Sequence, residues 1–294
     1  MNAGGTLAEA AGTPLPAGPE AEIPSVDWWM TSHCNLACDF CYGPVPGKDP
    51  VERRPAILEA LSASSARAVT FCGGEPLLIR GIGEYAATLR QCGKSTVLNT
   101  NGELLRRRLD QGLRLADFAM VGVSLEGSTP EVHRAMRGEK ADFDEVIEAA
   151  RLVSKEPGVR LKLATVVSAV NRADLPELAR AVRDLAPDIW RLYQYSRRGD
   201  QNVGQRRHWL ADDEFQRLAM KATALASPVP AAPSTEAETE GCLIVDPAGN
   251  VLQPAGAGYI QRGNCLTEPL DRIWADIPAQ SAIVNNKRWL SVLS

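Results

Sequence analysis

Three cysteines close together are the residues of this chain best suited to metal chemistry. Cys34, Cys38 and Cys41 fall in the run Cys-Asn-Leu-Ala-Cys-Asp-Phe-Cys, so one tight loop can bring all three thiols to one centre. A structural zinc site needs four ligands, and no fourth Cys or His follows at close spacing. A cubic iron–sulfur cluster on three thiolates keeps one iron open to an external ligand. The spacing favours such a reactive cluster, with a packed or zinc-binding cysteine loop as the alternative.

A glycine-rich turn follows the next predicted strand. The apolar run 68–72 leads directly into Gly73-Gly74-Glu75-Pro76. Glycines at a strand end allow close backbone approach, and proline suits the first turn of a helix. Glu75 is then expected at the strand end, where its carboxylate can accept hydrogen bonds from an ammonium group.

Together, the cysteine run and this turn resemble the radical S-adenosylmethionine (SAM) superfamily. The resemblance implies an enzyme with one [4Fe-4S] cluster on Cys34, Cys38 and Cys41, whose open iron binds SAM. One electron then cleaves SAM and releases a 5′-deoxyadenosyl radical that abstracts hydrogen from a substrate. The resemblance also implies a one-electron donor such as flavodoxin or ferredoxin.

Further segments resemble the parts of the superfamily that contact SAM. Two more predicted strands end in small polar residues, and an arginine lies downstream, where Arg137 aligns better than Arg134. The SAM contacts that the resemblance implies are Phe40, Tyr42, Gly73, Gly74, Glu75, Pro76, Asn99, Asn101, Ser124, Arg137 and Val167. For Asn101 and Ser124, ordinary turn capping is the alternative.

Strand and helix patterns alternate along the chain and predict an α/β fold. The predicted strands are 26–31, 68–72, 95–99, 118–124, 160–168 and 189–195, and the predicted helices are 55–63, 83–92, 103–113, 143–154, 175–185 and 212–225. Strands separated by helices form a parallel sheet, and right-handed crossovers curl it. We expect a partial (β/α)6 TIM-like barrel that is open on one side.

Composition divides the chain into four parts. Residues 1–24 are expected to be a disordered tail, 25–226 the barrel core, 227–240 a linker rich in Pro, Ala, Ser, Thr and Glu, and 241–294 an extension that covers the barrel opening. The extension begins with a predicted β-hairpin over 242–252. It resembles a degenerate SPASM/twitch-like extension without a cluster, because only Cys242 and Cys265 remain there.

Overall composition is that of an ordinary globular protein, with 45% hydrophobic and 23% charged residues. The net charge of −4 argues against a nucleic-acid partner. No signal peptide or long apolar span is visible. Seven cysteines without an export signal fit a reducing cytoplasm.

A narrower resemblance concerns the substrate. Residues 165–167, 189–195 and 210–215 resemble the second half of viperin, a radical SAM dehydratase of cytidine triphosphate, but Lys162-Leu163-Ala164 departs from its pattern. We therefore expect a viperin-like scaffold with a different small substrate. The candidate substrate contacts, near the ends of the last two strands, are Lys162, Tyr193, Gln194, Tyr195 and Arg197. Strand alternation separates Gln194 from the two tyrosines, and we expect Gln194 to face inward.

Two kinds of reaction remain open. One acts on a small polar substrate, such as a sugar, aminoglycoside, nucleoside or nucleotide, in biosynthesis, by epimerisation, dehydration, decarboxylation or carbon–carbon coupling. The other modifies a ribosomally synthesised peptide. A third interpretation is a non-catalytic regulatory protein that carries a cluster. If either cysteine of the extension acts chemically, we expect Cys265 to be a hydrogen donor, with a structural role as the alternative.

Overall fold

One curved sheet organises the molecule. The computed structural model describes residues 22–43, 49–199, 205–238 and 243–277. Its ten strands follow the order β10-β9-β8-β1-β2-β3-β4-β5-β6-β7, and β1 to β7 are parallel neighbours. The strands are β1 (Ser25–Thr31), β2 (Ala68–Gly73), β3 (Ser95–Thr100), β4 (Met120–Ser124), β5 (Arg160–Val167), β6 (Ile189–Gln194), β7 (Ala231–Ser234), β8 (Ile244–Val245), β9 (Asn250–Ala255) and β10 (Gly258–Asn264). The predicted partial barrel with a parallel sheet is confirmed.

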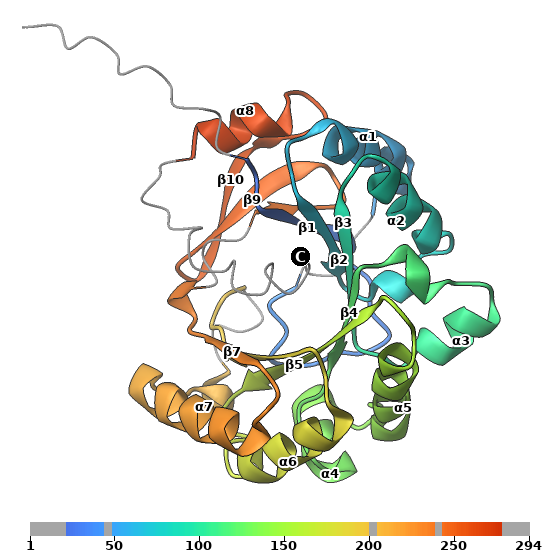
Figure 1. Ribbon diagram of the computed structural model, residues 1–294. Helices are drawn as coiled ribbons and strands as arrows, with labels where there is room; N and C mark the ends of the chain where they lie inside the picture. The colour runs from blue at the N-terminus through green and yellow to red at the C-terminus, as the bar shows by residue number, and fades with distance from the viewer. Residues whose placement is uncertain (1–21, 44–48, 200–204, 239–242, 278–294) are drawn as a thin grey trace, which may run out of the picture.

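The α-helices surround this sheet on its outer side (Figure 1). They are α1 (Arg54–Ala63), α2 (Ile82–Gln91), α3 (Leu105–Asp110), α4 (Pro130–Arg137), α5 (Phe143–Ser154), α6 (Leu175–Leu185), α7 (Asp212–Ala226) and α8 (Leu270–Ala275). Helix α4 was not predicted, because His133 and Met136 are its only buried residues. Thr129 caps its first turn and Pro130 begins it, which is the ordinary chemistry of a helix start.

Alternation along the strands places the main apolar face outward, and the inner face carries polar side chains together with a small apolar cluster of Val97, Met120, Ile189 and Ala232. On β2, Val69 and Phe71 join the hydrophobic core under the helices, so Thr70 and Cys72 point into the barrel. On β6, Trp190 and Leu192 join the same core, so Arg191 and Tyr193 point inward. The main core therefore lies between sheet and helices, and the barrel interior is free to carry polar groups.

The predicted linker and extension both belong to the sheet. Within 227–240, residues Ala231–Ser234 form β7, which pairs with β6, so this part of the linker prediction is wrong. The predicted hairpin is present as β8 and β9, and β10 extends it. Strand β8 pairs with β1, so the extension continues the sheet at the edge where the barrel begins.

Residues 1–21 and 278–294 lie outside the described residues, and with them most of the predicted tail and the end of the extension. Among the helices that the structure describes, none has the length and apolar character needed to span a bilayer.

Candidate active site

The cysteine loop follows β1 at the carboxyl end of the barrel. Within it, the Cys41 amide donates to the Cys38 carbonyl at 3.2 Å. The Leu36 amide donates to Cys34 Sγ and the Gly43 amide to Cys41 Sγ, both at 3.4 Å. Two sulfur atoms are thus already held as hydrogen-bond acceptors by main-chain amides of their own loop.

Two of the three thiols have raised pKa values. Burial raises the pKa of Cys38 to about 12 and also raises the pKa of Cys34; Cys41 adds to the increase in both, and Arg137 opposes it. Within the described ranges no three Cys, His, Asp or Glu side chains converge on a single metal ion. Three thiols on one loop are nevertheless the donor type that an iron–sulfur cluster uses.

A second segment holds this loop from its flank. His208 of the short 3-10 helix η4 (Arg206–His208) is fully buried, with Nε2 2.9 Å from Asp39 Oδ1 and Nδ1 3.2 Å from Ser168 Oγ. Its ring stacks on Tyr195 at 5.2 Å and meets the edge of Phe40 at 5.8 Å. Phe40 and Tyr195 are therefore side chains that position the loop.

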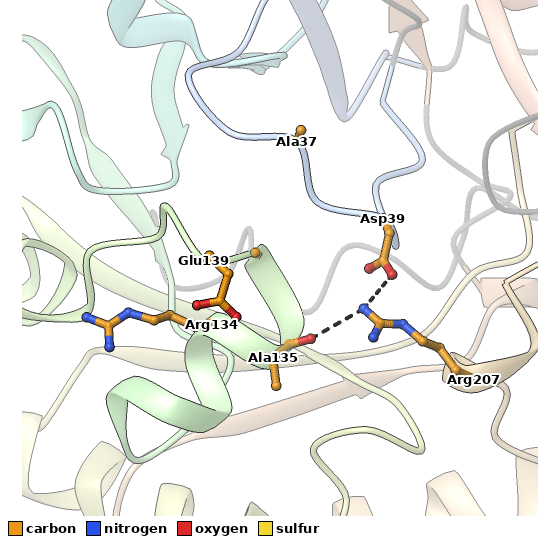
Figure 2. A pocket seen from close by; sticks show the side chains of 7 residues that line it. Ala37, Asp39, Arg134, Ala135, Glu139 and Arg207 are labelled. Atoms are coloured by element: carbon orange, nitrogen blue, oxygen red, sulfur yellow. Dashed lines mark hydrogen bonds and ion pairs between the residues drawn. The ribbon is translucent and has the colours of Figure 1, made fainter.

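Beside this contact lies a hollow of about 320 Å³. Arg207 reaches across it from η4 and pairs with Asp39 and with the Ala135 carbonyl (Figure 2). Arg134 and Glu139 line the other side. None of the residues that line this hollow lies on a strand of the barrel, so we do not assign the substrate to it.

The turn after β2 requires its glycines. A Cβ on Gly74 would lie 2.0 Å from the His33 carbonyl oxygen, and one on Gly73 would lie 2.6 Å from that of Thr31. Both contacts are far below van der Waals distance, and Gly73 also has a φ of +116°. The two glycines therefore let this turn lie directly against the start of the cysteine loop.

Glu75 is held firmly at this turn. Its Oε1 accepts from the Leu77 amide at 2.9 Å and the Thr100 hydroxyl at 2.8 Å, and its Oε2 accepts from the Asn101 amide at 2.9 Å. Burial raises its pKa to about 6, against the effect of these donors. A carboxylate offers about four acceptor positions, so Oε2 retains capacity for a further donor. Pro76 begins the following 3-10 helix η2 (Pro76–Leu78) and is buried.

Two polar side chains at the ends of β3 and β4 adjoin the same turn. Asn101 is 5% exposed and donates from Nδ2 to Asn35 Oδ1 at 2.8 Å, within the cysteine loop. The Ser124 hydroxyl donates to the Thr100 carbonyl at 3.3 Å. Both residues thus lie at the rim, as the barrel topology requires of strand ends.

A buried ion pair completes the rim. Arg137 Nη2 lies 2.7 Å from Glu126 Oε1, with side-chain exposures of 12% and 1%. Glu126 Oε2 also accepts from the Val166 amide at 2.7 Å. Although burial opposes its charge, Arg137 has a raised pKa because Glu126 lies beside it. Arg137 was predicted to face the SAM carboxylate, and here its guanidinium also lies 5.7 Å from the Phe40 ring centroid.

Below the rim, inward-facing residues form a charged interior. Lys162 is 4% and Arg191 2% exposed. Burial lowers the pKa of Lys162, and Arg191 acts in the same direction while Tyr193 and Asp27 oppose it. Burial also raises the pKa of Asp27 to about 6, with Lys162 opposing. Two cations thus share this space with one carboxyl group that holds its proton unusually tightly.

The remaining polar atoms of the interior include groups that lack partners. Arg191 donates to Ser234 Oγ at 2.8 Å and to the Tyr193 hydroxyl at 3.3 Å. In contrast, Asn99 Oδ1 is buried and has no hydrogen-bond partner among the described residues. A Cβ on Gly122 would lie 2.4 Å from Lys162 Cε and 2.6 Å from Asn99 Oδ1, so a glycine is needed where these two side chains meet.

Two predicted contacts face away from the interior. Gln194 donates to the Leu210 carbonyl at 3.1 Å and to Asp212 Oδ1 at 2.7 Å, at the start of α7. Its partner in the sheet, Val167, is fully buried in the main core. The expectation that Gln194 faces inward is therefore wrong, because Trp190 and Leu192 take the outer face of β6 and fix Gln194 there too. The side chain of Val167 likewise points away from any cofactor in the barrel.

Three further predicted residues lie outside the interior. Arg197 is exposed and pairs with Glu236 at 3.1 Å. Tyr42 is 46% exposed, and its carbonyl accepts from the Tyr259 hydroxyl at 2.7 Å. Cys265 is 6% exposed and belongs to the hydrophobic core with Leu270 and Ile273, where burial raises its pKa to about 11. Cys242 lies outside the described residues.

Sequence reasoning missed Asp27, Arg191 and His208. Strand alternation could have predicted that Asp27 and Arg191 face inward, because each lies between apolar neighbours that must face the helices. His208 had no such signal, because its contact with Asp39 joins segments 169 residues apart.

The comparison with known families agrees with this geometry. Residues 30–182, just over half of the chain, match the radical SAM superfamily. The chain therefore belongs to the radical SAM superfamily, whose members are enzymes.

Curated relatives differ in their stated activities. The chain is 31% identical over 160 residues to an Fe-coproporphyrin III synthase of Methanosarcina barkeri, covering 53% of this chain and 40% of that protein. It is 27% identical over 257 residues to an S-adenosylmethionine-dependent nucleotide dehydratase of Lacinutrix mariniflava, covering 81% of this chain and 52% of that protein. The chain thus spans about half or less of the length of these two relatives.

Solved structures share the fold. SuiB of Streptococcus suis, bound to the precursor peptide SuiA, aligns with a TM-score of 0.68 at 16% identity, covering 89% of this chain and 67% of that one. The enzyme anSMEcpe, with bound AdoMet and the Cp18Cys peptide, aligns with a TM-score of 0.66 at 15% identity, covering 90% and 83%. At such low identity these likenesses establish the barrel architecture alone.

Proposed function

We propose that this protein cleaves SAM reductively with one [4Fe-4S] cluster and abstracts hydrogen from a small polar substrate that carries an anionic group. The observation that carries this proposal is that two groups of functional side chains lie on the same strands of the barrel. The cysteine loop, the Gly73–Glu75 turn and Asn101 share the carboxyl end of the barrel, and the buried cations Lys162 and Arg191 lie on the inner face of the same strands.

The rim residues have distinct roles in this proposal. Cys34, Cys38 and Cys41 hold the cluster, which when bound supplies the electron that breaks a carbon–sulfur bond of SAM. Glu75 accepts a hydrogen bond from the SAM amino group with its remaining capacity at Oε2, because the Asn101 amide is the one donor to that oxygen among the described residues. Arg137 orients the carboxylate of SAM from the opposite side of the loop, while Glu126 keeps its guanidinium charged and in place. A flavodoxin- or ferredoxin-like protein is the proposed electron donor.

The interior residues select the substrate. Lys162 and Arg191 together outweigh Asp27, whose raised pKa keeps part of the population neutral near pH 6. Two buried cationic side chains on the inner face favour an anionic ligand such as a phosphate or carboxylate group. Sugars, aminoglycosides and nucleotides that bear such a group are the proposed class, with epimerisation, dehydration, decarboxylation or coupling as outcomes. Modification of a ribosomal peptide was the alternative, and the fold likeness to SuiB does not favour it over a small substrate.

The test is anaerobic reconstitution with iron and sulfide, followed by reduction in the presence of SAM. Wild-type protein should hold about four irons per chain and release 5′-deoxyadenosine and methionine. A Cys34→Ala/Cys38→Ala/Cys41→Ala variant should do neither, whereas Cys92→Ala, which changes an exposed cysteine after α2, should match wild type. Full iron content in the triple variant would overturn the cluster assignment.

A further inference from the structure

One thiol points into the barrel, and it is not the one expected from the sequence. Cys72 lies on β2 between Phe71 and Gly73, immediately before the turn that carries Glu75. Phe71 packs outward against Trp28 and Phe118, with ring centroids 5.7 and 5.9 Å apart, so Cys72 must take the inner face. Cys72 is partly accessible and free of any disulfide.

The side chains around Cys72 indicate a ligand in the same space. Thr70, two residues earlier on the same face, is 2% exposed, and its side chain hydrogen-bonds with the Asp27 side chain. On the neighbouring strand β3, Asn99 Oδ1 has no hydrogen-bond partner among the described residues, and the register of β2 with β3 places Asn99 beside Cys72. Buried polar atoms are normally satisfied, so this unpartnered oxygen on the inner face marks a place where a polar ligand supplies the missing bond.

Cys72 also lies between the two proposed binding regions. Gly73 and Gly74 follow it at the rim, and the β2–β3 register sets Cys72 beside Asn99, whose Oδ1 lies with the Lys162 side chain next to Gly122. Cys72 Sγ lies 3.6 Å from the Thr70 carbonyl oxygen, to which a protonated thiol can donate. A radical formed between the rim and the interior would therefore arise next to an S–H bond.

We propose that Cys72 is a catalytic hydrogen-atom donor that quenches a carbon-centred radical formed in the barrel. This inference rests on the proposed function. The S–H bond breaks, a C–H bond forms on the ligand, and a thiyl radical remains on Cys72. A reduced one-electron donor of the flavodoxin or ferredoxin class supplies an electron and solvent supplies a proton, which together restore the thiol. Such a donor fits redox-neutral inversion of a carbon centre better than elimination.

Deuterium transfer tests the donor role without knowledge of the substrate. Cluster-loaded protein is reduced with titanium(III) citrate in heavy water with SAM alone, and the released 5′-deoxyadenosine is analysed by mass spectrometry. The Cys72 thiol exchanges with solvent, so wild type should give mainly singly deuterated 5′-deoxyadenosine. Cys72→Ser should lower the deuterated fraction at least fivefold, because a hydroxyl is a poor hydrogen-atom donor. Cys265→Ala and Cys92→Ser should match wild type.

The possible results separate this proposal from the function on which it rests. Absence of 5′-deoxyadenosine from wild type would overturn the proposed function and the donor role together. If 5′-deoxyadenosine forms with equal deuterium content in wild type and Cys72→Ser, or without deuterium in wild type, the donor role alone is overturned.

A labelling experiment gives a readout that does not depend on activity or on how well a variant folds. Folded, cluster-loaded Cys92→Ser protein is treated with iodoacetamide, and labelled peptides are identified by mass spectrometry. Cys72 should be alkylated, saturating SAM should slow its alkylation at least threefold, and Cys265 should react only after unfolding. Failure of Cys72 to react in the folded protein, or a rate unaffected by SAM, would show that it does not face the ligand and would overturn the proposal.

Discussion

The rim of the barrel and its interior differ in how well their buried polar side chains are hydrogen-bonded. At the rim, Glu75 accepts three hydrogen bonds and Glu126 is both paired with Arg137 and bonded to a main-chain amide. In the interior, Asn99 Oδ1 lacks a partner among the described residues. The rim is thus a preorganised frame, whereas the interior leaves part of its hydrogen bonding to a ligand. Substitutions at the rim should therefore cost stability, and substitutions in the interior should cost binding.

The largest effect is expected from the buried ion pair of the rim. Arg137→Met leaves Glu126 buried without its partner and should lower the free energy of unfolding by about 3–5 kcal/mol. Chemical denaturation measures the loss. Arg180→Met is the matched control, because Arg180 pairs with Glu177 on the surface and should cost at most about 0.5 kcal/mol. Equal losses in the two variants would contradict the description of the rim as a stabilising frame.

A smaller loss is expected where the Gly73–Pro76 turn meets the cysteine loop. Gly74→Ala places a Cβ against the His33 carbonyl and should destabilise the protein by about 1–3 kcal/mol. It should also reduce iron retention, because the loop itself must move. Gly258→Ala is the control, since a Cβ there meets nothing within 4 Å. Iron content after gel filtration, together with urea denaturation, distinguishes displacement of the loop from a general loss of stability.

The buried carboxyl group of Asp27 in the interior should make the stability of the protein depend on pH. The folded-state pKa of Asp27, about 6, lies above its ordinary value of 3.8, so the folded protein retains a proton that the unfolded chain releases. Stability should fall as pH rises from about 4 through about 6. In Asp27→Asn, the decrease in the free energy of unfolding over this pH range should be smaller by about 1–2 kcal/mol. Asp184→Asn, at an exposed position, is the control. Urea midpoints between pH 4 and 8 test the sign, and a wild-type slope in the variant would contradict it.

The smallest effect on stability is expected at Lys162. Lys162→Met removes a buried charge and should leave the free energy of unfolding unchanged or raise it by about 1 kcal/mol. Inorganic triphosphate should raise the Tm of wild type through preferential binding to the folded state and should lose this effect in the variant. Lys221→Met, an exposed substitution with the same change of net charge, should retain it. A triphosphate shift that persists without Lys162 would remove this residue from the anion site.

Local chemistry explains which parts of the site could be predicted from the sequence. The cysteine loop and the Gly73–Pro76 turn are each continuous in sequence. The residue types within each segment indicate its local structure, as the glycines that permit close approach do. The six principal strands were predicted because their apolar runs are long. Strand β7 was not, because Ala231-Ala232-Pro233-Ser234 has no β-branched or aromatic residue and is a strand only through pairing with β6.

The interior was harder to predict because alternation gives two faces but does not say which is inside. Gln194 was assigned inward on chemical grounds. The deciding information was present in Trp190 and Leu192, whose large apolar surfaces had to face the helices. In a barrel with a polar interior the apolar face of a strand points outward, which reverses the usual rule. The same reversal places Cys72 on the inner face of β2, whereas Cys265 belongs to the hydrophobic core.

The pairing of β8 with β1 has a consequence for how this protein tolerates truncation. β1 carries the cysteine loop, and without β8 its backbone would form an unprotected sheet edge, open to pairing with other chains. A chain cut after residue 238 would thus lose more than an accessory segment. It would expose the edge of β1, the strand that leads into the cysteine loop, so the hairpin protects this edge against pairing with another chain.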